Sequence, residues 1–178
     1  MILAHYTTDE SNYNECLKRG TIVPTKDWYG KKLFAEDFLA GDHKYVFLLV
    51  NERYVALDED GEDNSFGFIL DAESLVEKNN ALVGPDLLNE YRVLLNECAT
   101  HTVLQSATLK NVQLLIRGIL AGDTNEPGVT ETVLLFRERA TELQSERRCR
   151  GEAALKLLQE TSEPLELLVN VAAPPTDS

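Results

Sequence analysis

The sequence predicts an α+β fold, in which a strand-rich N-terminal half forms a mixed or antiparallel sheet and helices mainly from the C-terminal half pack against it. Short β-favouring runs separated by glycine, proline and polar turns occupy the chain before Pro85, and apolar residues at helical spacing dominate after it. The chain has 178 residues, of which 43% are hydrophobic, and this size fits one domain. We therefore expect a single globular domain over residues 1–172 and a frayed tail over residues 173–178.

Several runs in the N-terminal half have strand character and are bounded by glycine, proline or polar residues. They cover residues 2–6, 21–24, 33–35, 45–50 and 66–70. The run 45–50 is continuously apolar, as in strands that are buried on both faces, and we expect it at the centre of the sheet. A helix over residues 12–19 should stop at Gly20, and a short helix should begin at Asp71.

Helices dominate the C-terminal half. Apolar residues follow three- and four-residue spacing over 87–98 and again over 109–120, which predicts two amphipathic helices. A third helix should begin near Thr130 and bend at Gly151. The apolar run 165–171 predicts a last strand.

The net charge of −13 is unevenly distributed along the chain. Residues 1–90 hold 18 acidic and 8 basic side chains, a balance of −10. Such a field repels a nucleic-acid duplex, so we do not expect direct nucleic-acid binding by this half. It suits either a basic protein partner or simple solubility.

Targeting signals and metal motifs are not evident in the sequence. No apolar run approaches the length of a membrane span, and the start lacks the pattern of a signal peptide, so we expect a cytoplasmic protein. Three widely spaced cysteines predict reduced thiols. The acidic run 58–63 has Asp63 where a calcium loop needs glycine, and the three histidines are too far apart in sequence to form a zinc motif, so we expect no metal.

The start of the chain carries the most suggestive polar residues. His5 and Thr7 end a short apolar run, which would place an imidazole and a hydroxyl at a strand end, where they can hold a sugar by hydrogen bonds. The opening LAHYTT, the helix end CLKRG, the turn WYG, and the strands YVFL and GFILD resemble the first half of ADP-ribosyltransferase-like domains. The resemblance covers roughly residues 1–75.

This resemblance implies transfer of ADP-ribose from NAD to a macromolecular acceptor. His5 would position the ribose next to nicotinamide, and Tyr29 or Tyr45 would stack on the nicotinamide ring. Glu166, in an apolar strand, resembles the family's glutamate, which stabilises the oxocarbenium-like ribose, and Glu152 is the reserve.

Further residues would hold NAD itself. Thr7 and Tyr45 would contribute to the cofactor site. The arginines near residue 148 form either a solvated helix face, neutralised by intervening glutamates, or a site in which Arg148, or its neighbour Arg147 or Arg150, binds a cofactor phosphate.

A second hypothesis is that the chain is a binding protein rather than an enzyme. A small acidic interaction or inhibitor protein, of the type that phages and mobile elements encode, would use its carboxylates to bind a basic protein surface and could mimic DNA. A transferase-like fold that has lost its chemistry and kept a binding role would combine the two. Convergence of His5, a tyrosine and a glutamate on one cleft would favour the enzyme, and their dispersal over different faces would oppose it.

Overall fold

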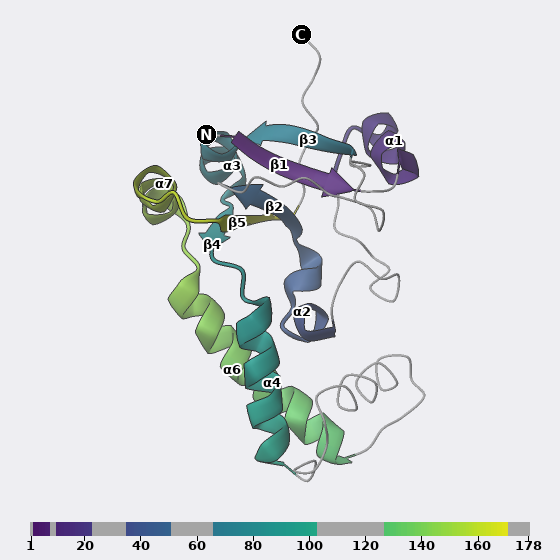
Figure 1. The fold of residues 1–178 in the computed structure, drawn as a ribbon, viewed down its shortest axis with the longest axis vertical. Helices are drawn as coiled ribbons and strands as arrows, with labels where there is room; N and C mark the ends of the chain where they lie inside the picture. Colours follow the sequence, from purple (N-terminus) through teal and green to yellow (C-terminus); the bar gives the residue numbers. More distant parts are fainter. Residues whose placement is uncertain (1, 8–9, 23–34, 51–65, 103–126, 171–178) are drawn as a thin grey trace. The chain divides into compact units, whose positions relative to one another are not determined.

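The structure is a computed structural model that describes residues 2–7, 10–22, 35–50, 66–102 and 127–170 (Figure 1). Strands and helices alternate through these residues. In chain order they are β1 (Ile2–Thr7), α1 (Glu10–Arg19), α2 (Ala35–Leu39), the 3-10 helix η2 (Asp42–Lys44), β2 (Val46–Val50), β3 (Phe66–Asp71), α3 (Ala72–Asn79), β4 (Leu82–Gly84), α4 (Leu88–Thr100), α6 (Pro127–Arg147), α7 (Gly151–Glu160) and β5 (Leu165–Val169). The predicted α+β class is confirmed.

Two compact units share the chain. The first, called here the sheet unit, comprises residues 1–24, 45–85 and 148–178, and the second, the helical unit, comprises residues 25–44 and 86–147. Each unit has a buried apolar core of its own. The expected single domain over residues 1–172 stays a prediction, which the number of unfolding transitions would test.

The sheet unit is built on a five-stranded sheet of order β3-β1-β2-β5-β4, and each of its strand pairings is antiparallel (Figure 1). The predicted central position of β2 is confirmed. Within β2, Val46, Leu48 and Val50 are buried, whereas Phe47 and Leu49 are half-buried. Burial therefore alternates along the strand, and the expectation of a strand buried on both faces is met on one face only.

Three helices supply apolar side chains to the core of the sheet unit. Ala72 and Val76 of α3 join this core together with Ala154 and Leu158 of α7, and residues of α1 pack against it. The expectation that helices mainly from the C-terminal half cover the sheet is therefore wrong, since α1 and α3 belong to the N-terminal half. The description of that half as strand-rich is not confirmed either, because its four described strands alternate with helices.

The long C-terminal helices pack with each other. In the helical unit α4 contacts α6 and α2 contacts both of them. The rings of Tyr91 and Phe136 meet edge to face with centroids 6.0 Å apart, and Leu95 and Ala140 are buried beside them. The apolar stripe of α4, which was expected to cover the sheet, is satisfied within the helical unit. Ala35, predicted as part of a strand over 33–35, begins α2 instead.

The predicted bend at Gly151 is a complete break between α6 and α7. The backbone of Cys149 pairs with Val83 of β4, with N–O distances of 2.9 and 3.0 Å. Gly151 then adopts φ +60°, a left-handed conformation that glycine takes without steric cost, and α7 begins there. The predicted helix end at Gly20 and helix start at Asp71 are confirmed: Gly20 has φ +70° directly after α1, and Asp71 is the N-cap of α3.

Several sequence predictions lie outside the described residues. They concern most of the strands predicted over 21–24 and 33–35, the acidic run 58–63, the helix over 109–120, Tyr29 and the tail 173–178. None of the helices that the structure describes is long and apolar enough to cross a membrane.

Candidate functional site

Three adjacent strands carry residues predicted for the NAD site. His5 lies in β1, Tyr45 directly precedes β2 and Glu166 lies in β5, and these strands are neighbours in the order β1-β2-β5. Because β1 and β2 are antiparallel, the end of β1 at Thr7 and the beginning of β2 next to Tyr45 lie at the same end of the sheet. The sheet thus brings these segments into one neighbourhood.

The strand register nevertheless separates the two residues predicted to carry the chemistry. Ala4 pairs with Leu49, and Leu49 pairs with Glu166, so these three positions share one face of the sheet. His5 follows Ala4, and successive strand residues point to opposite faces. The register positions of His5 and Glu166 therefore lie on opposite faces.

The position of His5 is on the face that contains the core. It pairs with Phe68, which is buried in the core of the sheet unit. Glu166 is half-buried on the other face and is flanked by Leu49 and Gly84 in the neighbouring strands. A ribose held between these two positions would have to contact both sides of the sheet.

The reserve glutamate is also remote from β1. Glu152 is exposed in the first turn of α7, and α7 packs on β4. In the sheet, β5 and β2 lie between β4 and β1. Glu152 therefore does not replace Glu166 as the partner of His5.

Of the other predicted residues, Tyr45 is half-buried and Arg148 is buried, with a relative exposure of 8%. Arg148 follows the end of α6 and belongs to the sheet unit, and Arg147 and Arg150 on either side of it are exposed. Burial of Arg148 does not fit its alternative assignment to a solvated helix face. Tyr29 lies outside the described residues, so the structure does not place it.

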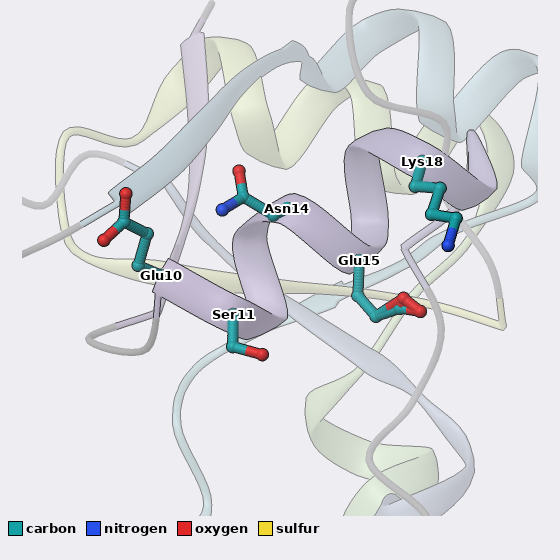
Figure 2. Close-up of a pocket in the computed structure, with 5 residues that line it drawn as sticks. All are labelled: Glu10, Ser11, Asn14, Glu15 and Lys18. Carbon is teal, nitrogen blue, oxygen red and sulfur yellow. The ribbon is translucent and has the colours of Figure 1, made fainter.

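A shallow hollow lies along one side of α1 (Figure 2). Its volume is about 610 Å³. It is lined by Glu10, Ser11, Asn14, Glu15 and Lys18. Two carboxylates, one ammonium, a hydroxyl and an amide can bind a polar or cationic group. Sequence reasoning did not single out these residues, although their three- and four-residue spacing places them on one side of a helix.

The helical unit contains a buried polar cluster that sequence reasoning also missed. Tyr91 Oη donates to Asp42 Oδ2 over 2.9 Å, and the two residues are 0% and 1% exposed. Gln144 Nε2 donates to Tyr91 Oη and to the carbonyl oxygen of Ala40, each over 2.9 Å. Because these polar groups satisfy one another, the cluster holds α4, α6 and the segment after α2 together.

Neither Cys98 nor Cys149 carries an activated thiol. Burial raises the pKa of the Cys98 thiol, and the nearby Arg139 only partly opposes this effect. Burial also raises the pKa of the Cys149 thiol. Both groups stay protonated at neutral pH, and the protonated thiol is a poor nucleophile. Among the described side chains, no group of three or more His, Cys, Asp or Glu could hold a metal ion.

The sequence matches no family model, no curated protein and no solved structure. Function is therefore inferred from the charge and geometry of the chain itself.

Proposed function

We propose that this chain is a non-enzymatic acidic interaction protein whose sheet unit binds a basic protein surface. The supporting observation is the division of charge between the two units. The sheet unit holds 17 acidic and 7 basic residues, a net charge of −10, whereas the helical unit holds 13 and 10, a net charge of −3. Charge concentrated on one unit steers a basic partner toward it and repels nucleic acid.

Exposed carboxylates of the sheet unit are distributed over its helices, the end of β3 and the turn before β5. They are Glu10, Glu15, Asp71, Glu77, Glu152, Glu160 and Glu163. Glu160 forms a weak, exposed ion pair with Lys156 at 3.9 Å. A further six acidic residues lie in the segment 51–65, outside the described residues. The described carboxylates are exposed to solvent, where lysine or arginine side chains of a partner can contact them.

Transfer of ADP-ribose from NAD is the second proposal. The adjacency of β1, β2 and β5 favours it, because these strands bring the segments around His5, Tyr45 and Glu166 together. The opposite faces of His5 and Glu166 weigh against it. In this proposal Glu166 would stabilise positive charge on the ribose as nicotinamide leaves.

The first experiment measures binding of oligolysine by calorimetry at about 0.05 M and about 0.5 M salt. One variant carries Glu10→Gln, Glu15→Gln, Glu77→Gln, Glu152→Gln and Glu163→Gln in the sheet unit. The control carries Glu97→Gln, Glu131→Gln, Glu138→Gln, Glu142→Gln and Glu146→Gln in the helical unit. All ten side chains are exposed, and both variants raise the net charge by the same amount.

The proposal predicts that the native protein binds oligolysine more weakly at high salt. It also predicts that the sheet-unit variant loses this binding, while the helical-unit control retains most of it. Equal losses in the two variants would show that only overall charge matters and would contradict a binding surface on the sheet unit. Absence of binding at low salt would also contradict it.

A second experiment tests the enzyme directly. Nicotinamide release from NAD is followed with the native protein, Glu166→Gln and His5→Ala. The acidic-binder proposal predicts no release above the rate without protein. Release that both variants abolish would establish NAD chemistry and would overturn the primary proposal.

A further inference from the structure

The two edges of the sheet differ in how they are protected. The β4 edge is short, and Val83 at its centre exchanges backbone hydrogen bonds with Cys149 on the side away from β5. That segment covers the hydrogen-bonding groups of β4. Natural proteins commonly protect edge strands by short length or by a covering segment, and β4 has both.

The β3 edge has neither form of protection among the described residues. β3 spans six residues, Phe66–Asp71, and each of them pairs with β1. No other described strand pairs with β3, which is the terminal strand in Figure 1. Its sequence, FGFILD, contains neither proline nor lysine, the residues that most often block an edge. In an antiparallel pair every second residue turns its N–H and C=O away from the partner, so β3 presents a row of such groups.

Acidic side chains lie on the helix that packs on β3 and at the end of β3 itself. Helix α1 packs on β1 and β3, and the ring of Tyr13 stacks on Phe68 with centroids 4.8 Å apart. Glu10 and Glu15 of α1 are exposed and line the hollow in Figure 2. Asp71, also exposed, ends β3 itself. An extended segment added to β3 would therefore lie in a negative field.

We propose that the β3 edge binds an extended basic peptide segment as an added strand. Backbone N–H and C=O groups of the segment would pair with β3, and its lysine or arginine side chains would meet the carboxylates of α1 and Asp71. A second copy of the chain fits less well, because two sheet units of net charge −10 repel each other. This inference rests on the proposed function and specifies its partner as a strand-forming basic segment.

The test uses a peptide of alternating lysine and valine and two N-methylated forms of it. In each form the backbone nitrogen of every second residue is methylated. One form thereby loses the N–H groups along one hydrogen-bonding edge of the strand, and the other form loses those along the opposite edge. Because an added strand pairs along only one edge, we expect one form to bind like the parent and the other to bind about 30- to 100-fold more weakly. Equal affinities of the two forms would overturn strand addition.

Protein variants test the location of the peptide. Glu10→Gln with Glu15→Gln should weaken binding of the unmethylated peptide several-fold. The matched control, Glu138→Gln with Glu142→Gln, removes equal charge from exposed positions of α6 in the helical unit, so it should bind the peptide like the native protein. A larger loss in the control would overturn the assignment to β3.

The outcomes separate this inference from the proposed function. Oligolysine binding with equal affinities of the two methylated forms would leave the acidic binder standing and reject the β3 edge. Absence of binding by every basic ligand would reject both.

Discussion

Removal of the Tyr91 hydroxyl tests the buried polar cluster of the helical unit. In Tyr91→Phe the carboxylate of Asp42 loses a 2.9 Å hydrogen bond and Gln144 loses one of its acceptors. A hydrogen bond to a carboxylate contributes about 1.5–3 kcal/mol, so we expect the free energy of unfolding to fall by about 2–3 kcal/mol. This is a large part of the ~5–15 kcal/mol that stabilises a typical domain. Urea unfolding followed by circular dichroism measures it.

A double-mutant cycle with Asp42→Asn isolates the contact between the two side chains. Asparagine keeps the size of the side chain and one acceptor oxygen but not the charge, so Tyr91→Phe should cost only about 1 kcal/mol in this background. A cost of Tyr91→Phe below about 0.5 kcal/mol, or an equal cost in both backgrounds, would refute the assignment of Asp42 and Tyr91 as a stabilising pair.

Three further predictions follow from the sheet unit and the cysteines. Gly151→Ala should destabilise the protein by about 1–2 kcal/mol in thermal unfolding, because φ +60° strains an L-residue. The strain comes from the backbone alone, since nothing lies within 4 Å of the added Cβ, and an unchanged stability would contradict this conformation. Asp71→Ala should cost about 1 kcal/mol in urea unfolding, because its side chain accepts the N–H of Glu73 at the start of α3, and an unchanged midpoint would refute that cap. Burial raises the pKa of the Cys98 and Cys149 thiols in the folded state, so the unfolded chain loses these protons first and stability should fall as pH rises above about 8.5. Cys98→Ala should reduce that slope in unfolding curves at a series of pH values, and an identical slope would contradict it.

Local signals in the sequence predicted several features of the fold. The apolar run 45–50 predicted the central strand because few other segments can fill the middle of a sheet. Gly20 and Asp71 predicted a helix end and a helix start because each supplies a conformation or a hydrogen bond that such ends require.

Features that depend on long-range pairing could not be predicted. The faces of His5 and Glu166 follow from the registers of two strand pairs, and a shift of one residue in either register would reverse the result. The hydrogen bond between Asp42 and Tyr91 joins residues 49 positions apart. Helical periodicity shows that a helix has an apolar face but not which element covers it, so the packing of α4 against α6 was not predicted.

Hydrogen exchange with two ligands tests the central claim most directly. Amide exchange is measured for the protein alone, with oligolysine and with NAD. An acidic binding surface on the sheet unit predicts slower exchange in α1 and β3 with oligolysine, no change in α4 and α6, and no effect of NAD. Protection of β1 and β5 by NAD, without protection by oligolysine, would contradict the claim and favour the transferase.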